Sequence, residues 1–293
     1  MPTKAKAAIA LGTFDGLHRG HRKILNAALN ADGLMPVAVT FNEPPKCYTS
    51  KDPVPVLMSS ERKIKLLKQM GFSEIISLEY KKVHDMTAKE FLDFLFSKYN
   101  VRLAVCGDNY RFGKGGAGNT EYLSDYCKEH NANAMVFPME KSDGKIISST
   151  FIRELIAEGK IKEANALLGQ PFSFEAEVVH GAKRGRELGF PTINQTLERS
   201  SVTPKFGVYA SRVTIDDKKL PSITNIGLRP TFQYDEPISE THILGFKGDL
   251  YGKKIEVELL GFLREEKKFK TADELKETIS DDLKNSEKVF KSL

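Results

Sequence analysis

The sequence has no tryptophan, few cysteines and no long apolar run, and each of these absences narrows the class of protein. Its three cysteines, at positions 47, 106 and 127, are far apart, which suits a reducing compartment and argues against a disulfide scaffold. No apolar run reaches the length of a membrane span, and residues 1–10 lack the apolar core of a signal peptide. We therefore expect a cytoplasmic protein with no membrane partner.

The charge balance is mildly basic. The formal net charge is +5 over 293 residues, and the lysines and arginines form no concentrated stripe. Such a surface suits small anionic ligands and does not predict a nucleic-acid partner. The sequence leaves the oligomeric state open.

The pattern of predicted elements changes near residue 170. Before it, apolar strands alternate with helical patterns, which predicts a doubly wound parallel sheet of the α/β class. After it come short runs of β-branched and aromatic residues, which predict a small antiparallel β-barrel. The first set of predicted strands is 7–11, 36–41, 74–78, 103–106 and 135–138, and the second is 174–179, 207–215, 221–226, 241–246 and 255–260.

Two helix starts carry capping-box patterns. Thr87 and Glu90 begin a helix that runs to residue 98, and Thr271 and Glu274 begin a last helix with exposed charge. A short helix at 161–168 is expected to link the two halves. We place one domain at 1–158, the linker helix at 159–170 and a second domain at 171–293.

Residues 12–21, GTFDGLHRGH, follow the first apolar strand and open a helix. Glycines let the backbone approach a phosphate, and the free amides at a helix start attract its charge. His18 and His21 add donors for a phosphoryl group. A zinc pair and buried structural histidines are the alternatives, but no Cys-x-x-Cys supplies further zinc ligands. The whole turn favours a nucleotide site, and its His-x-Gly-His pattern resembles the nucleotidyltransferase superfamily.

Two further segments suit the same site. Asp108 and Asn109 follow a predicted strand, where they would reach ribose or base edges, or else cap a turn. Ser148, Ser149 and Arg153 lie at the start of a helix. A simple N-cap explains one hydroxyl, whereas several hydroxyls with an arginine suit phosphate binding.

In the second half, residues 180–194 are rich in glycine and basic residues, which suits a loop over phosphates or a solvated basic loop. Thr192 and Asn194 alternate in an extended segment, so they point to one side. Their hydroxyl and amide oxygens suit them as ligands of a magnesium ion that also binds the nucleotide phosphates.

Seven ordered motifs together resemble the bifunctional riboflavin kinase and FMN adenylyltransferase family, the prokaryotic FAD synthetases. The resemblance covers nearly the whole sequence. The motifs are 12–21, 107–113, 148–153, 185–194, 225–231, 240–244 and 249–252.

The resemblance implies two ATP- and Mg²⁺-dependent reactions with riboflavin, FMN and FAD as substrates and products. The first domain, nucleotidyltransferase-like, would join AMP to FMN, with His18 and His21 at the α-phosphorus and Asn109 near adenosine or flavin. Ser148, Ser149 and Arg153 would hold the leaving pyrophosphate. The ATP-binding set is Gly12, Phe14, Asp15, Gly16, His18, His21, Asp108, Asn109, Ser148, Ser149 and Arg153.

For the second domain, the resemblance implies a riboflavin kinase. Glu240 would be the base that accepts the proton of the riboflavin 5′-hydroxyl, and Thr192 and Asn194 would hold the metal. Asn109, Glu240 and Arg264 would contact flavin. The kinase ATP-binding set is Gly181, Lys183, Gly185, Arg186, Gly189, Pro191, Thr192 and Asn194.

The chain departs from the family pattern after the second strand, where residues 42–45, NEPP, lack a histidine that many members carry. Two alternatives to a bifunctional enzyme remain. In one, a single domain is active and the other binds flavin or nucleotide. In the other, the scaffold is a non-enzymatic sensor, which would have no need of His21, Arg153 or Glu240.

Overall fold

The computed structural model describes residues 5–52, 54–181, 189–230 and 235–291. Contacts divide the chain into two units, Met1–Ser149 and Thr150–Leu293, and each is described by itself. Helices of the first unit are α1 (Arg19–Leu29), α2 (Lys46–Thr49), α3 (Ser60–Met70), α4 (Tyr80–Val83), α5 (Ala88–Lys98) and α6 (Thr120–Glu129), with a 3₁₀ turn at Lys114–Gly116.

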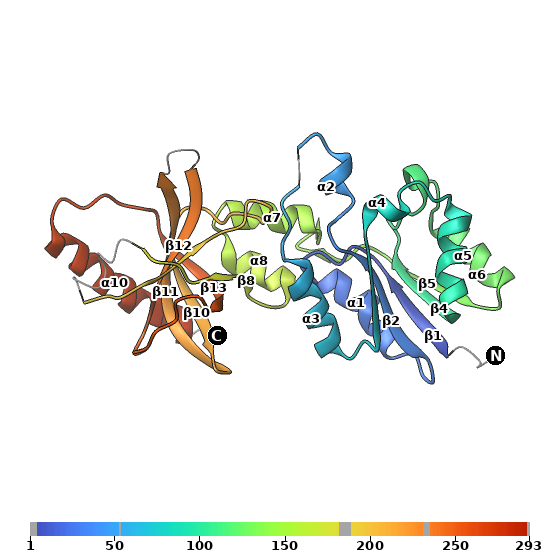
Figure 1. The fold of residues 1–293 in the computed structure, drawn as a ribbon, viewed down its shortest axis with the longest axis horizontal. Coiled ribbons are helices and arrows are strands. Elements are labelled where there is room, and N and C mark those ends of the chain that lie inside the picture. Colours follow the sequence, from blue (N-terminus) through green and yellow to red (C-terminus); the bar gives the residue numbers. More distant parts are fainter. Residues whose placement is uncertain (1–4, 53, 182–188, 231–234, 292–293) are drawn as a thin grey trace. The chain divides into compact units, whose positions relative to one another are not determined.

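A parallel sheet forms the centre of the first unit (Figure 1). Its strand order is β3-β2-β1-β4-β5, and every neighbouring pair is parallel. A short hairpin, β6 (Lys141–Ser142) and β7 (Lys145–Ile146), follows it. The sheet strands are β1 (Lys6–Leu11), β2 (Met35–Phe41), β3 (Glu74–Leu78), β4 (Asn100–Gly107) and β5 (Asn133–Phe137).

Both faces of this sheet are covered, as the near-continuous apolar strands require. Along β1, Ile9 and Leu11 pack on the face that α5 and α6 cover. Ala8 and Ala10 face the opposite side, where they meet α1 and α3. Successive side chains of a strand alternate between faces, so a strand apolar at every position suits a sheet between two helix layers. The predicted doubly wound sheet is confirmed.

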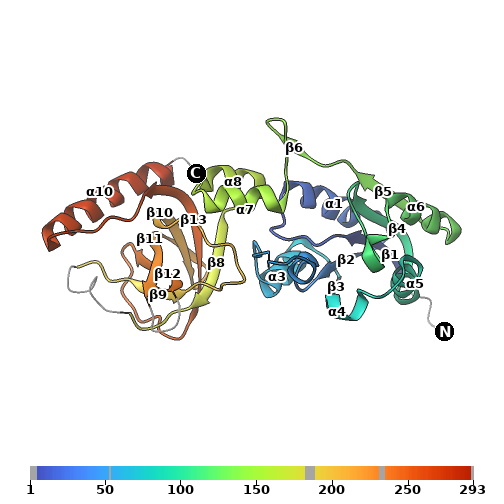
Figure 2. The ribbon, with the colours of Figure 1, turned by 90° about the horizontal axis from the view of Figure 1, so that it is seen from above.

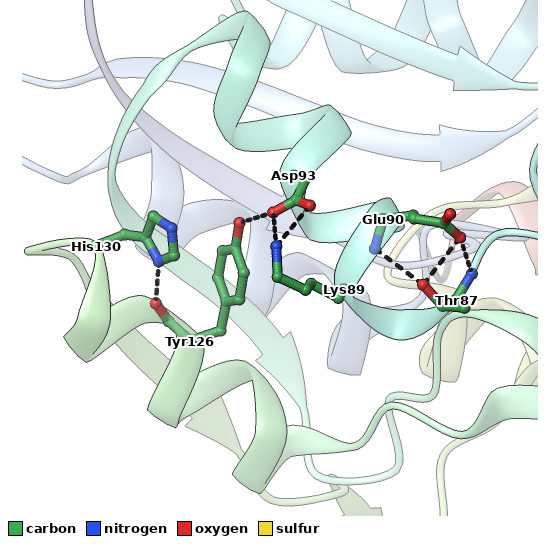
Figure 3. Close-up of polar contacts among 6 residues, drawn as sticks. All are labelled: Thr87, Lys89, Glu90, Asp93, Tyr126 and His130. Atoms are coloured by element: carbon green, nitrogen blue, oxygen red, sulfur yellow. Dashed lines mark hydrogen bonds and ion pairs between the residues drawn. The ribbon is translucent and has the colours of Figure 1, made fainter.

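Polar contacts join α5 to α6 on the surface of this unit (Figure 3). The predicted capping box is present, because Thr87 N donates to Glu90 at 2.8 Å and Glu90 N donates to the Thr87 hydroxyl at 3.2 Å. The Tyr126 hydroxyl donates to Asp93 at 2.6 Å, and the Tyr126 ring stacks on His130 with centroids 4.1 Å apart. These contacts hold the helices over the sheet.

The second unit contains α7 (Ser149–Ala157), α8 (Ile161–Leu168), an antiparallel sheet and α10 (Ala272–Lys291). Ser149, the first residue of α7, belongs to the first unit. The sheet order is β8-β13-β10-β11-β12-β9. Helix α10 packs across β10 and β13 (Figure 2), with Val289 against Ala210 and Leu260. The strands are β8 (Phe172–Glu177), β9 (Ile193–Thr196), β10 (Gly207–Ile215), β11 (Lys218–Pro230), β12 (Asp235–Ile243) and β13 (Lys254–Arg264).

The sheet curls into a nearly closed barrel. Its end strands approach each other where Val179, just beyond β8, donates its N–H to Asn194 O of β9 at 2.8 Å. The Gln195 amide, fully buried, donates to Ala176 O of β8 at 2.7 Å. Inside, the Ser211 hydroxyl bonds to that of Thr224 at 2.7 Å. The predicted antiparallel barrel is confirmed.

Two local expectations differ from the structure. The strand predicted at 241–246 is β12, which begins at Asp235 and ends at Ile243. It ends there because Gly245 takes a left-handed φ of 70°, which breaks the extended backbone. At the last helix, Glu274 N donates to the Thr271 hydroxyl as predicted, but the Glu274 carboxylate accepts from Lys270 N, one residue earlier than in a capping box.

Candidate active sites

The turn at 12–21 leaves β1 with an unusual backbone. Phe14, Gly16 and Leu17 have φ values of 50°, 84° and 47°, so three residues of a short stretch are left-handed. A Cβ on Gly12 would lie 2.7 Å from the Phe14 ring, which requires glycine at that position. The side chains of Phe14 and Leu17 are fully buried beneath the turn. Buried apolar side chains thus hold a backbone conformation that costs energy locally.

His18 and His21 lie together at the start of α1. His18 is the N-cap, and its Nδ1 accepts the His21 N–H at 3.3 Å. The rings stack with centroids 3.6 Å apart. Burial lowers the pKa of His18 to about 4. Burial, with the nearby charges of His18 and Lys63, holds the pKa of His21 well below its ordinary value. Both imidazoles are therefore neutral at pH 7.

The neutral state fixes which ring nitrogens donate. Because His18 Nδ1 accepts a hydrogen bond, its proton lies on Nε2. His21 Nδ1 is buried and has no hydrogen-bond partner among the described residues. A buried polar atom without a partner costs about 1–3 kcal/mol, and such atoms in native proteins point to function. The pair thus offers imidazole nitrogens at a helix N-terminus.

Asp15 and Ser149 hold the turn in place. The Asp15 carboxylate, 3% exposed, accepts the N–H of Leu57 at 2.9 Å. The Ser149 hydroxyl donates to the backbone oxygen of Asp15 at 2.9 Å. Ser148 precedes Ser149, which is the first residue of α7 and the last of the first unit. Arg153 follows one helical turn later on α7, in the second unit.

Asp108 and Asn109 follow β4, the neighbour of β1. Both side chains are exposed, and the Asp108 carboxylate accepts the N–H of Met139 at 3.2 Å. The strand order reverses between β1 and β4, and in open α/β sheets ligands bind in the crevice at the carboxyl ends of such strands. The structure therefore brings the turn at 12–21 and the residues after β4 to one edge of the sheet.

In the barrel, register places Glu240 between two asparagines. Asn194 of β9 lies directly opposite Glu240 of β12, which lies directly opposite Asn225 of β11. Directly paired residues of antiparallel strands share a face, so these three side chains form one row. Ser239 and Thr241, on either side of Glu240, are fully buried inside the barrel, whereas Glu240 is partly exposed. The row therefore lies on the outer face.

Asn225 is a residue that sequence reasoning missed as a site candidate. It begins the motif at 225–231, which carried part of the resemblance, but nothing in one strand shows which residue of another lies opposite it. Cross-strand pairing supplies that information.

The segment before β9 is anchored to β12, the strand that carries Glu240. The His242 ring bonds through Nδ1 to Pro191 O at 2.8 Å and meets the Phe190 ring edge-on. A Cβ on Gly181 would lie 2.4 Å from the Asn194 amide carbon, so glycine leaves room for that amide. Gly189 is left-handed with φ 89°, and nothing crowds it. The candidates Lys183, Gly185 and Arg186 lie outside the described residues.

Arg264 occupies the far end of the same row. It pairs with Val208 of β10, which in turn pairs with Asn225. Its guanidinium donates to the buried Asp282 carboxylate of α10 through Nε and Nη2, at 2.9 and 2.8 Å. A further bond runs to Glu265 O at 3.1 Å. In this structure the side chain of Arg264 fastens α10 to the barrel, a role that sequence reasoning did not assign to it.

The described residues contain neither a cluster of metal-ligating side chains nor a membrane-spanning helix. Within residues 5–52, 54–181, 189–230 and 235–291, no three His, Cys, Asp or Glu side chains gather as metal ligands. In the same ranges, every helix is too short or too polar to cross a membrane.

The fold and the two candidate sites define a class of protein with a doubly wound α/β unit followed by a β-barrel unit that has its own polar site. Family models match both parts, FAD synthetase over residues 1–151 and riboflavin kinase over residues 168–290. The chain belongs to the bifunctional riboflavin kinase/FMN adenylyltransferase family, which confirms the resemblance that the motifs predict.

Relatives match over nearly the full length. The bifunctional riboflavin kinase/FMN adenylyltransferase of Bacillus subtilis (strain 168) is 33% identical over 299 residues, covering 99% of this chain and 94% of the relative. That of Escherichia coli (strain K12) is 36% identical over 282 residues, covering 94% and 90%. A crystal structure of a protein described as a macrolide-efflux protein from Streptococcus pneumoniae superposes with a TM-score of 0.86, at 30% identity, covering 98% and 95%.

Proposed function

We propose that the chain carries out both reactions of its family in order, phosphorylating riboflavin to FMN in the barrel and joining AMP to FMN in the first unit. One observation carries this proposal: each unit has its own polar site, suited to a different nucleophile. The His18–His21 pair lies at the start of α1, and the row of Asn194, Glu240 and Asn225 crosses the barrel.

Adenylyl transfer needs donors more than a base. A phosphate oxygen of FMN, already ionised at neutral pH, attacks the α-phosphorus of ATP, and the bond to pyrophosphate breaks. His18 and His21, neutral at pH 7, donate to the oxygens on which charge builds, together with backbone N–H groups at the start of α1. Ser148, Ser149 and Arg153 bind the leaving pyrophosphate, and Asn109 contacts adenosine or flavin.

Phosphorylation of riboflavin requires a base. The 5′-hydroxyl oxygen attacks the γ-phosphorus of ATP, ADP leaves, and the hydroxyl proton passes to the Glu240 carboxylate. Asn194 and Asn225 lie directly opposite Glu240 on either side, which suits them to orient its carboxylate. Pro191 and the backbone near it are fixed by His242, so the phosphate-binding segment is held against the strand of the base.

Magnesium fits the barrel site. Thr192 and Asn194 offer a hydroxyl and an amide oxygen, which are ligands that Mg²⁺ accepts alongside phosphate oxygens and water. The Asn194 amide packs against Gly181, where a Cβ would displace it, so glycine at 181 keeps this ligand in place. Mg²⁺ bound there would neutralise charge on the ATP phosphates.

We assign the adenylyltransferase to residues 1–158, a linker helix to 159–170 and the kinase to 171–293. Helix α8, at Ile161–Leu168, supports the linker assignment. A cytoplasmic location agrees with Cys47, Cys106 and Cys127, all of which lie among the described residues and form no disulfide. Riboflavin, FMN and ATP are the proposed partners.

The test is a time course with the purified chain, riboflavin, ATP and Mg²⁺, in which the flavins are separated by chromatography. We expect FMN to rise first and FAD to follow. FMN without FAD would leave only the kinase assignment standing. If no FMN forms while supplied FMN becomes FAD, the barrel assignment is wrong. Absence of both products would overturn the proposal.

A further inference from the structure

A lysine is buried beside the turn at 12–21. Lys63 belongs to α3, which begins after the N-cap Ser59, and its side chain is only 3% exposed. Its ammonium donates to Phe41 O at 2.5 Å and to Thr13 O at 3.2 Å. Lysines are almost never fully buried unless they are paired. The burial of Lys63 is therefore explained by the two carbonyl oxygens that accept its hydrogen bonds.

The two acceptors lie at the ligand edge of the sheet. Phe41 is the last residue of β2, and Thr13 belongs to the turn after β1. The Thr40 hydroxyl also donates to Thr13 O, at 2.8 Å. The peptide between Thr13 and Phe14 is trans, so its C=O and N–H point in opposite directions. Because the Thr13 oxygen points toward Lys63, the Phe14 N–H points away from Lys63. Lys63 thus sets the direction of a backbone donor in the turn.

Charged and titratable groups surround the ammonium on several elements. Asp15 of the turn and Cys47 of α2 act to raise the pKa of Lys63, but burial outweighs them and lowers it to about 8. His21 of α1 lies close enough for the charge of Lys63 to lower its pKa. The ammonium is charged at pH 7 and loses its charge as the pH rises above about 8.

We propose that Lys63 is a positioning residue for adenylyl transfer, which holds the Thr13 carbonyl so that the turn presents its backbone donors to the ATP phosphates. Lys63 acts through the turn. This inference rests on the adenylyltransferase function proposed for the first unit.

The first test compares Lys63→Met with Lys65→Met in the full chain, measuring FAD formation from FMN, ATP and Mg²⁺. Lys65 lies on the same helix but is exposed, so it controls for loss of one charge. We expect Lys63→Met to lower kcat about 100-fold, as misplacement of a catalytic group does. KM for FMN and the riboflavin kinase activity should stay near wild type, as should every activity of Lys65→Met.

The second test needs no variant. The wild-type kcat/KM of FAD formation for ATP, measured from pH 6 to about 9.5, should fall on the alkaline side with a midpoint near 8. Lys63→Arg, which stays charged, should move this fall to higher pH. A flat wild-type profile overturns the proposal, as does wild-type kcat in Lys63→Met. If Lys63→Met does not fold, the wild-type profile decides. A wild-type chain that makes no FAD at any pH instead overturns the proposed function.

Discussion

The two candidate sites of this chain differ in the chemical groups that they contain. In the first unit, two neutral, stacked imidazoles lie at a helix start beside the edge of a parallel sheet. In the barrel, a carboxylate lies between two amides on the partly exposed outer face of an antiparallel sheet. The first candidate site is largely buried and rich in nitrogen donors, whereas the second presents a partly exposed carboxylate, the base that we propose for the kinase.

The difference follows from the nucleophiles. An FMN phosphate enters already ionised, so the first site has only to stabilise charge at the α-phosphorus. The riboflavin hydroxyl must lose a proton, so the second site needs a group that accepts it. Variants that affect one reaction and spare the other test this comparison directly.

Glu240→Gln should have the largest effect. Removing the base while keeping the shape of the side chain is expected to slow FMN formation about 1000-fold. FAD formation from supplied FMN should be unchanged. Glu175→Gln, an exposed glutamate on β8, is the matched control. Both rates are measured in the same preparation, and equal loss of both in a folded Glu240 variant would contradict the assignment.

His21→Ala should give the reverse result. Loss of one preorganised donor is expected to slow FAD formation about 100-fold and to leave FMN formation intact. His84→Ala, which removes an exposed histidine of the same unit, should alter neither rate. Unchanged FAD formation in the His21 variant would mean that the imidazole pair is structural.

Asn194→Ala should give a smaller and more selective change. We expect the Mg²⁺ concentration for half-maximal kinase activity to rise about tenfold, since a ligand oxygen is lost. The Mg²⁺ dependence of FAD formation should not change, and Asn194→Asp should restore the kinase value. Titration of Mg²⁺ at saturating ATP measures both, and an unchanged requirement would remove Asn194 from the metal site.

Much of the fold was predictable because local chemistry decides it. The strands Glu74–Leu78 and Gly207–Ile215 and the helix Ile161–Leu168 have the predicted bounds. In the two strands, apolar and β-branched residues are concentrated, and in the helix the buried residues recur at helical spacing. β12 was placed too late because Pro237 and the polar residues around it resemble a loop, although the oxygen of Pro237 accepts the N–H of Leu197 at 2.8 Å.

The sites were less predictable, since they depend on residues brought together by the fold. The motifs identified His21 and Glu240 as candidates, but the register that sets Asn225 opposite Glu240 is a property of two strands. Lys63 was missed for a different reason. A lysine in an amphipathic helix is usually exposed, and only the carbonyl oxygens of Thr13 and Phe41, distant in sequence, explain its burial.

The Nδ1 of His21, which has no hydrogen-bond partner among the described residues, has a consequence for substrate selection. A correct substrate that bonds to this nitrogen removes a cost that the folded protein already bears, whereas an analogue lacking the matching atom leaves that cost in place. Sites with buried polar groups of this kind reject near-isosteres by large factors without any steric clash. Discrimination among nucleotide analogues would thus begin with one ring nitrogen that no group in the described part of the chain satisfies.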